Sequence, residues 1–360
     1  MRSARAYRRY APAAPAKPAS SAGGGLPLRT DEVARQAARL VVIDRAGDSL
    51  AIDRFAALPA HLRPGDLVIV NDAATLPASL SGATARGERF ELRLSAPIDG
   101  SRLYGVLLGP GDHRTRTEHR LPPPAIGAGD EVALGGLHAR VVAVAGRRVE
   151  LIAREAADVL WQALYASGRP VQYAHRPELL PLYAVQTAYA ARPWAAEMPS
   201  AGRPLTWDVL LRLRRAGIEV ATLTHAAGLS STGDEALDRA LPWPERYEIP
   251  RRTAEAVARA KARGGRVVAI GTTVVRALEA CALANAGALV AGSGVATLRL
   301  DASYRLRIAD GLVSGLHVPG ESHFELLRAF APRDRLERAI VLAAARGLSS
   351  HELGDACLIL

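Results

Sequence analysis

Apolar and polar residues alternate in two different ways along this chain of 360 residues. In residues 26–77 and 154–360, short apolar runs alternate with amphipathic segments, a pattern typical of a mixed or parallel sheet covered by helices. In residues 78–153, short alternating runs are separated by Gly and Pro clusters, which is typical of a small antiparallel barrel or sandwich. We therefore predict an α/β fold, of the mixed α+β kind, in which a main α/β domain carries an inserted small antiparallel β-barrel-like domain.

The same periodicity predicts the individual elements. The expected strands cover residues 40–44, 49–54, 67–70, 89–94, 103–108, 131–134, 138–144, 148–153, 218–223, 266–270 and 356–360. The expected helices cover residues 156–166, 206–216, 253–263 and 274–284, and a last long helix begins at a capping-box-like pair, Asp334 and Glu337, and stops at Gly347. Residues 167–205 form a long connection rich in Pro and aromatic residues, which indicates either a functional or a disordered segment.

The N-terminal segment differs from the rest in composition and charge. Residues 1–25 are rich in Ala, Pro, Ser and Gly and predict a disordered basic tail, with order beginning near Asp31. Residues 1–30 carry six basic side chains and no acidic one, out of a net charge of +10. A flexible tail with some RNA affinity is favoured over a transit peptide, because the segment lacks an apolar helical face. The remaining chain is mildly basic, which fits an RNA substrate or simple solubility almost equally well.

Several functional classes are excluded by what the sequence lacks. No apolar run approaches the roughly 20 residues that cross a bilayer, so no membrane association is expected. Cys281 and Cys357 are the only cysteines, which fits a reducing cytosol and a packing role. No P-loop, dinucleotide-binding glycine motif, zinc-type Cys/His spacing or nucleophile elbow is present. We therefore expect no metal and no bound cofactor.

One stretch, residues 266–280, combines a buried strand, a tight turn and a helix. Gly271 permits the turn, Thr272 and Thr273 are the expected N-cap residues, and the helix follows. The free N–H groups of such a helix start attract an anion or a polar ligand edge. Arg276 falls on the same helical face, beside the same opening. The alternative is a capped helix that only packs on the sheet, with Arg276 in solvent.

Other polar residues stand where predicted strands end, and two of them are histidines that could act as acid or base near neutral pH. His317 lies between a Gly turn and a Pro-Gly break, and His225 ends a predicted strand; for each, a structural role is the alternative. His323 and His351 are interpreted as structural or surface residues. The other members of this group are Asn71, Asp72, Thr224, Ser314 and Asp355.

Taken together, these segments resemble the queuosine-pathway S-adenosylmethionine:tRNA ribosyltransferase-isomerase family, known as QueA. The segment 271–279 looks like that family's Gly-Thr-Thr-Ser-Val-Arg-Thr-Leu-Glu motif, and Ser200 and Gly202 fall in a segment like its Pro-Thr-Ala-Gly motif. The resemblance runs from about residue 26 to the C-terminus. Further similar segments, in the family's order, are 63–72, 76–78, 247–250, 291–294, 316–319 and 354–356.

The chain resembles a diverged member, because several positions of those motifs differ. The family's Asn-Asp-Thr-Arg is Asn71 and Asp72 followed by two alanines, so a threonine and an arginine are lost. A basic residue of another family motif is replaced next to an acid, at Gly320. The substituted positions are Ala73, Ala74, Ser79, Pro204 and Gly320.

The resemblance implies a reaction and a set of roles. Family members transfer and isomerise the ribosyl group of S-adenosylmethionine onto an aminomethyl-deazaguanine at the tRNA wobble position, giving epoxyqueuosine and releasing adenine and methionine. S-adenosylmethionine is thus a substrate, and the tRNA anticodon stem-loop is the macromolecular partner. His317 and His225 are the available catalytic bases. The implied substrate-binding residues are Asn71, Asp72, Ser200, Gly202, Thr272, Thr273, Arg276 and Asp355.

Two other interpretations stay open. The chain could be a diverged paralogue that binds S-adenosylmethionine or another nucleoside but uses a different acceptor, or a non-catalytic RNA-binding protein on the same scaffold. For the enzyme we expect a monomer in the cytoplasm. We also expect five residues that are distant in sequence to line one cleft: Asn71, Thr272, Arg276, His317 and Asp355.

Overall fold

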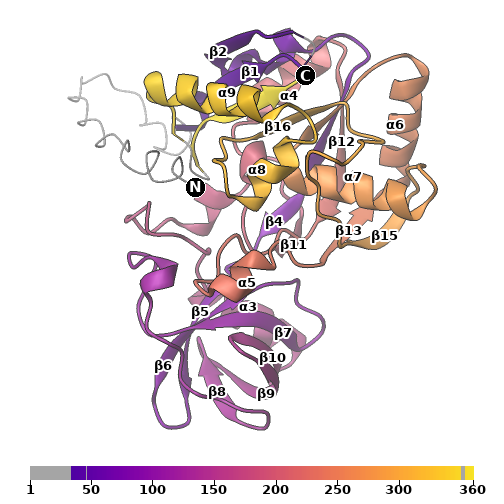
Figure 1. The fold of residues 1–360 in the computed structure, drawn as a ribbon. Helices are drawn as coiled ribbons and strands as arrows, with labels where there is room; N and C mark the ends of the chain where they lie inside the picture. The colour runs from indigo at the N-terminus through magenta and orange to yellow at the C-terminus, as the bar shows by residue number, and fades with distance from the viewer. Residues whose placement is uncertain (1–33, 46, 350–352) are drawn as a thin grey trace, which may run out of the picture.

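The computed structural model describes residues 34–45, 47–349 and 353–360. The predicted tail of residues 1–25, the predicted start of order near Asp31, and His351 lie outside the described residues. Figure 1 shows two parts of the molecule. One is a large sheet with helices on both faces, and the other is a separate barrel joined to one end of it. The predicted mixed α+β class is therefore confirmed.

A nine-stranded mixed sheet forms the larger part. Its central strands β12, β3, β14 and β16 run parallel, and antiparallel strands close both edges. In spatial order the strands are β15 (Gly292–Ala296), β13 (Glu245–Ile249), β12 (Glu219–His225), β3 (Leu67–Asn71), β14 (Val267–Ile270), β16 (Gly311–Gly315), β17 (Ala356–Ile359), β1 (Arg39–Ile43) and β2 (Leu50–Arg54).

Helices cover both faces of this sheet because its buried strands send alternate apolar side chains to opposite sides. Along β3, Leu67 and Ile69 pack in one apolar cluster with α6, α7 and α9, while Val68 and Val70 pack in another with α4 and the 3₁₀ helix η1. The helices are η1 (Phe55–His61), α4 (Trp207–Arg215), α6 (Arg251–Ala262), α7 (Thr272–Ala284), α8 (Ser322–Leu327) and α9 (Arg333–Ala345).

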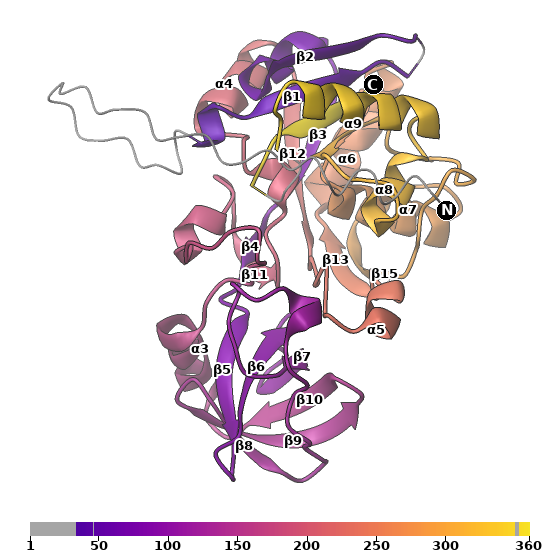
Figure 2. The ribbon, with the colours of Figure 1, turned by 60° about the vertical axis from the view of Figure 1, so that its left-hand side comes forward.

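The inserted segment is a closed six-stranded antiparallel barrel, as predicted. Figures 1 and 2 show it at one end of the molecule, away from the large sheet. Between residues 85 and 150 the described helical structure is one short 3₁₀ turn, η2 (Thr117–His119). The barrel strands, in spatial order, are β10 (Arg148–Ala153), β7 (Arg102–Leu108), β6 (Arg89–Leu94), β5 (Ser79–Thr84), β8 (Glu131–Leu134) and β9 (Leu137–Ala145).

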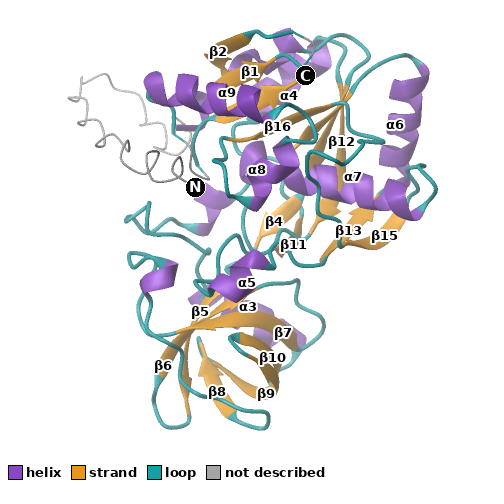
Figure 3. Cartoon of the chain, viewed as in Figure 1, coloured by secondary structure: helices purple, strands orange, loops and turns teal. Residues whose placement is uncertain are grey.

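The link between barrel and sheet is a parallel pair of short strands, β4 (Ala73–Thr75) and β11 (Arg192–Ala195). The long connection of residues 167–205 contains β11, which Figure 3 labels beside β4, and two 3₁₀ turns, η3 (Leu182–Val185) and η4 (Ser200–Gly202). The domain boundaries at residues 78 and 153 stay a prediction. The apolar cluster of the barrel also includes Leu160 and Leu164 of α3 (Ala157–Ser167), which follows the last barrel strand.

Two predicted helix starts are wrong in detail. The N-cap of α7 is Gly271, with φ of 97°, and both Thr272 and Thr273 are already helical. The N-cap of α9 is Pro332, so Asp334 lies in the first turn and Glu337 instead pairs with Arg333. The predicted cap at Thr206 is confirmed, since its Oγ1 accepts the N–H of Val209 at 3.4 Å.

Candidate functional site

A cavity of about 780 Å³ lies among the loops at the ends of the central strands. Carboxyl ends of parallel strands meet at one edge of a sheet, so loops far apart in sequence converge there. The walls come from the described segments 197–204, 227–231, 238–245, 271–276, 298–301, 314–326 and 354–356, and from Tyr173 and His175. A volume of this size is in the range of small-molecule sites.

The start of α7 forms one wall of this cavity. Gly271 has a φ of 97°, which an L-residue rarely adopts, and its N–H donates to the carbonyl of Val313 at 2.7 Å. The turn therefore ties β14 to β16 and aims the first turn of α7 at the cavity. Thr272 and Thr273 line the wall, and their backbone N–H groups belong to the helix start, where no intrahelical acceptor exists. This geometry suits an anion or a ribose oxygen.

Arg276 lies on the same wall but is buried and fully engaged. Its Nη1 pairs with Oε2 of Glu245, Nε donates to the carbonyl of Leu298, and Nη2 donates to the carbonyls of Trp243 and Ala296. Burial, with a smaller effect from Arg299, lowers the pKa of Arg276 to about 10. The alternative in which Arg276 extends into solvent is wrong, because the side chain fastens α7 to the segment before β13.

His317 lines the cavity from the loop that follows β16. Its Nδ1 lies 3.3 Å from Oε2 of Glu321, and its ring stacks on His323 with centroids 4.7 Å apart. Burial raises the pKa of Glu321, but the hydrogen bond and charge of His317 outweigh it, so the pKa ends below its usual value. Burial, and then the charge of His317, lower the pKa of His323 to about 3. The two rings and one carboxylate form a compact titratable cluster.

Asp355 and Ser200 also lie on the cavity wall. The carboxylate of Asp355 is engaged from behind: Oδ1 accepts the N–H of Arg39 at 2.6 Å, and Oδ2 accepts the N–H of Ser349 at 2.8 Å and the Arg39 guanidinium at 3.1 Å. These bonds fix the approach to β17. Ser200 opens the short η4 turn beside the start of α7.

Four of the expected site residues are not on this wall: Asn71, Asp72, Gly202 and His225. The buried Asn71 accepts the N–H of His225 at 2.9 Å and donates to Oγ1 of Thr273 at 3.3 Å, so it braces the wall from beneath. Asp72 accepts the Thr224 hydroxyl at 2.6 Å. The expectation that Asn71 lines the cleft with the other four residues therefore needs correction.

Gly202 and His225 are packed in the interior of the protein, off the cavity wall. A Cβ on Gly202 would lie 2.0 Å from the hydroxyl of Tyr189, so a larger residue there would force the Tyr189 side chain to shift. His225 is completely buried, and burial, together with the charge of Arg276, lowers its pKa well below the usual value. Within the described residues neither ring nitrogen makes a hydrogen bond, and Nε2 lies 3.5 Å from Oε2 of Glu245.

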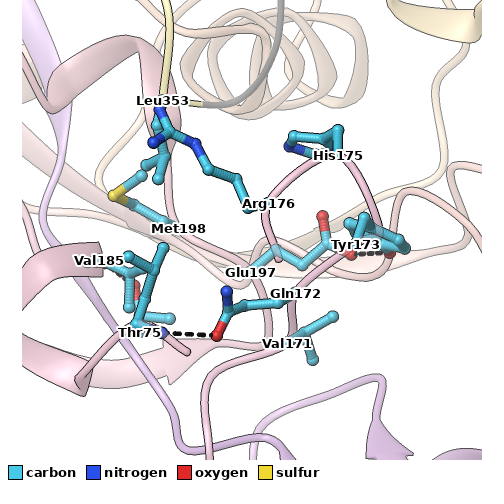
Figure 4. Close-up of a pocket in the computed structure, with 11 residues that line it drawn as sticks. Thr75, Val171, Gln172, Tyr173, His175, Arg176, Val185, Glu197, Met198 and Leu353 are labelled. Carbon is cyan, nitrogen blue, oxygen red and sulfur yellow. Dashed lines mark hydrogen bonds between the residues drawn. The ribbon is translucent and has the colours of Figure 1, made fainter. Parts of the chain in front are cut away.

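A carboxylate that sequence reasoning missed, Glu197, lines the cavity from the end of the β11 segment. Its Oε1 accepts the hydroxyl of Tyr173 and the N–H of Ser230, the latter at 2.8 Å. Glu197, Tyr173, His175 and Met198 also line a neighbouring cavity of about 30 Å³, shown in Figure 4. That volume holds about one water molecule. Burial raises the pKa of Glu197, although the bonds from Tyr173 and Ser230 and the charge of Arg93 oppose the shift.

Comparison with known proteins shows the family of this chain. Residues 26–359 match the family model described as queuosine biosynthesis protein. The chain belongs to the queuosine biosynthesis family. It is 36% identical over 336 residues to the S-adenosylmethionine:tRNA ribosyltransferase-isomerase of Thermus thermophilus, covering 91% of this chain and 93% of that protein. It is 33% identical to the enzyme of the same name from Trichlorobacter lovleyi, covering 90% and 93%. The crystal structure of the S-adenosylmethionine tRNA ribosyltransferase of Thermotoga maritima aligns with a TM-score of 0.48 and 22% identity, over 93% of this chain and 95% of that one.

Five positions of this chain differ from the motifs of the queuosine family. Some of them lie at the cavity, and the others lie away from it. Pro204 and Gly320 line the large cavity. Ala73 and Ala74 form the linking strand β4, and the hydroxyl of Ser79 donates to Glu91 in the barrel at 2.8 Å. Only Pro204 and Gly320 among these five can therefore touch a ligand in the cavity directly.

The signals for the missed residues of this queuosine-family site were weak. Glu197 stands two positions before the Pro-Ser-Ala-Gly segment, but nothing in the sequence pairs it with Tyr173, 24 positions earlier. His323 was assigned a structural role, yet it lines the cavity beside His317. In the described ranges no group of three or more His, Cys, Asp or Glu could hold a metal ion. None of the helices described is long and apolar enough to span a bilayer.

Proposed function

We propose that this chain transfers and isomerises the ribosyl group of S-adenosylmethionine onto the aminomethyl-deazaguanine at the wobble position of tRNA. The product would be epoxyqueuosine, with release of adenine and methionine. The observation that carries the proposal is the match, over about nine-tenths of the chain, to relatives named S-adenosylmethionine:tRNA ribosyltransferase-isomerase. The family to which the chain belongs acts in queuosine biosynthesis.

The chemistry of the large cavity supports this proposal. S-adenosylmethionine has a carboxylate, a ribose and a cationic sulfonium centre, so it needs hydrogen-bond donors at one end and carboxylates at another. The N–H groups and hydroxyls of Thr272 and Thr273 supply donors for a carboxylate or a ribose oxygen. Ser200 and Asp355 offer further polar contacts across the cavity. His317 is the histidine of the expected pair that reaches the cavity, and we propose it as an acid or base there.

We propose further that the partner is the tRNA anticodon stem-loop, that the enzyme acts as a monomer in the cytoplasm, and that it needs no bound cofactor or metal. The buried residues Asn71, Asp72, Gly202 and His225, which lie off the cavity wall, then hold the shape of the site and do not contact the substrate. Arg276 supports the wall through its ion pair with Glu245. Activity of the chelator-treated protein and its mass by light scattering test two of these points.

The deciding experiment measures adenine release from S-adenosylmethionine by chromatography, using purified protein and a tRNA transcript that carries the aminomethyl-deazaguanine. We expect release that depends on both substrates and stops when an unmodified transcript is used. A folded protein that releases no adenine under these conditions would contradict the proposal.

The second candidate is a paralogue that binds S-adenosylmethionine or another nucleoside but modifies a different acceptor. Pro204 and Gly320 favour it, because both substitutions lie on the cavity wall. Calorimetry separates the outcomes: binding of S-adenosylmethionine without adenine release supports the paralogue, and no binding supports a non-catalytic RNA-binding protein.

A further inference from the structure

Glu197 occupies a rigid position at the junction of the two cavities. It follows Ala195, the last residue of β11, and Ala196, and both of these residues are completely buried. The N–H of Ala196 donates to the carbonyl of Ala227, and the carbonyl of Ala195 accepts the N–H of Leu76, both at 2.8 Å. The backbone at Glu197 is thus held from both sides, so its side chain has a fixed origin. Figure 4 shows Glu197 close to Tyr173 at the small cavity.

The two oxygens of this carboxyl group have different surroundings. Oε1 accepts both the Tyr173 hydroxyl and the N–H of Ser230. Tyr173 is itself fixed, since its hydroxyl also contacts Ser231: it lies 3.2 Å from the carbonyl and 3.1 Å from the N–H. Both hydrogen bonds from Tyr173 and Ser230 end on Oε1, and the Ser230 hydroxyl also lies near the carboxyl group. One oxygen is therefore anchored, and the other is available to a ligand in the large cavity.

Among the described residues no basic side chain forms an ion pair with this carboxyl group, although the charge of Arg93 acts to lower its pKa. Arg93, on β6, lies with its guanidinium carbon 5.1 Å from the Tyr173 ring centroid, but its Nε is bound to Glu91 at 2.8 Å. From the 167–205 connection, His175 and Arg176 line the small cavity beside Tyr173. On the other side the carboxylate of Asp238 accepts the hydroxyls of Ser231 and Thr232 at 3.2 and 2.6 Å. Burial therefore outweighs the opposing hydrogen bonds and raises the pKa of Glu197, so its carboxylate is a stronger proton acceptor than an exposed one.

The proposed ribosyl transfer needs a proton acceptor in the cavity. An aminomethyl substituent is an ammonium ion at neutral pH, and its nitrogen attacks carbon only after losing a proton. His225 is sealed in the core, whereas Glu197 lines the cavity. We propose, on the basis of that function, that Glu197 is the base that deprotonates the acceptor amine.

The step balances without any further reactant. The N–H bond of the ammonium breaks, an O–H bond forms at Oε2 of Glu197, and the electron pair of the N–H bond stays on nitrogen. When this pair forms the new N–C bond to the ribosyl group, a bond from that group to adenine or methionine breaks, and its electron pair leaves with the released product. The carboxylic acid returns its proton to solvent after product release. Tyr173 is a positioning residue in this scheme, because it contacts only Oε1.

The test compares Glu197→Gln with the wild type and with Glu178→Gln, a control in the same connection whose exposed side chain leaves its backbone bond to Gln172 intact. We expect Glu197→Gln to lower kcat for adenine release by about 10²–10⁴-fold, with KM for tRNA little changed. Glu178→Gln should retain wild-type kcat. Tyr173→Phe removes a bond that favours the ionised carboxylate, so the acid limb of its kcat/KM profile should move to higher pH.

The outcomes distinguish the role of Glu197 from the proposed ribosyl transfer on which it rests. Absence of adenine release by the wild type removes the proposed function and, with it, the role of Glu197. Release by the wild type together with wild-type kcat in Glu197→Gln overturns the role of Glu197 alone. A rise in KM with unchanged kcat, or an acid limb that does not move in Tyr173→Phe, would also overturn it. Melting curves of each variant show whether a loss of activity comes from unfolding, and Glu197→Asp then provides a folded replacement.

Discussion

Arg276 of α7 and Glu245 of β13 form a buried ion pair on the wall of the large cavity. Oε1 of Glu245 also accepts the N–H of Gly228 at 2.6 Å, and Oε2 lies 3.5 Å from Nε2 of His225. One carboxylate thus connects α7 with the end of β12 and the loop after it. The wall is held together by the ion pair with Arg276 and the hydrogen bond from Gly228, neither of which an apolar side chain at position 245 could form.

Removing Glu245 should be strongly destabilising. Glu245→Ala leaves the guanidinium of Arg276 buried without its counter-charge, which typically costs about 3–5 kcal/mol. The measurement is the free energy of unfolding in urea. Glu219→Ala is the matched control, since it breaks an exposed pair with Arg259 at 2.9 Å and should cost about 0–1 kcal/mol. Equal losses in the two variants would show that the buried pair contributes no more than a surface one.

The turn at Gly271 should be intolerant of a side chain. Gly271→Ala forces a Cβ onto a residue with φ of 97°, which should cost about 1–3 kcal/mol and disturb the start of α7. We therefore expect weaker binding of S-adenosylmethionine by calorimetry. Gly264→Ala, at a φ of 71° in open space away from the cavity, is the control for backbone strain alone. Unchanged binding in Gly271→Ala would separate this helix start from the ligand.

Replacement of His317 should affect turnover far more than stability. The ring contacts Glu321 and stacks on His323, so His317→Ala should cost about 1 kcal/mol of unfolding free energy. If His317 exchanges a proton during the reaction, kcat should fall by about 10²–10⁴-fold. Adenine release and a melting curve test both parts, with His138→Ala on the barrel as control. Full activity in His317→Ala would exclude it from the mechanism.

Folding stability should decrease between pH 7 and pH 5 because of His323. Its pKa is lowered to about 3 in the folded state, so the unfolded chain takes up the proton first as the pH falls below about 6.5. The stabilising difference is present above the unfolded pKa and is lost as the pH falls toward the folded one. His323→Phe, which keeps an aromatic ring on His317, should reduce the loss at pH 5 by about 1–2 kcal/mol. His138→Phe should leave the loss unchanged, and urea unfolding at both pH values measures it.

The sequence was most informative about strands with strict alternation. The predicted spans 89–94, 131–134 and 148–153 agree with the structure, because each has apolar residues on one face of the barrel. Strand β5 was missed: its sequence, Ser79–Thr84, contains one buried apolar side chain, Leu80, and the rest is small or polar. The partners of β5 in the barrel, and not its own residues, determine that it is a strand.

The site was predictable where it depends on local geometry. The turn at Gly271 gave Thr272 and Thr273 correctly as neighbours of an opening. The sequence could not show that Arg276 faces Glu245, 31 positions earlier, or that Tyr173 reaches Glu197. Nor could it separate His225 from His317, which both stand at or just after the end of a strand. In the structure His225 ends β12 and is completely buried, whereas His317 follows β16 and lines the cavity.

Strand β17 lies inside the large sheet, between β1 and β16, although it is the last strand in chain order. The pairing of Leu40 with Ala356 spans more than 300 residues, so during synthesis β1 must wait for its partner until almost the whole sequence has left the ribosome. The barrel strands need no segment beyond residue 153 to pair with one another. We infer that the barrel can fold while the chain is still being made, and that the cavity, which includes residues 354–356, is among the last parts to form.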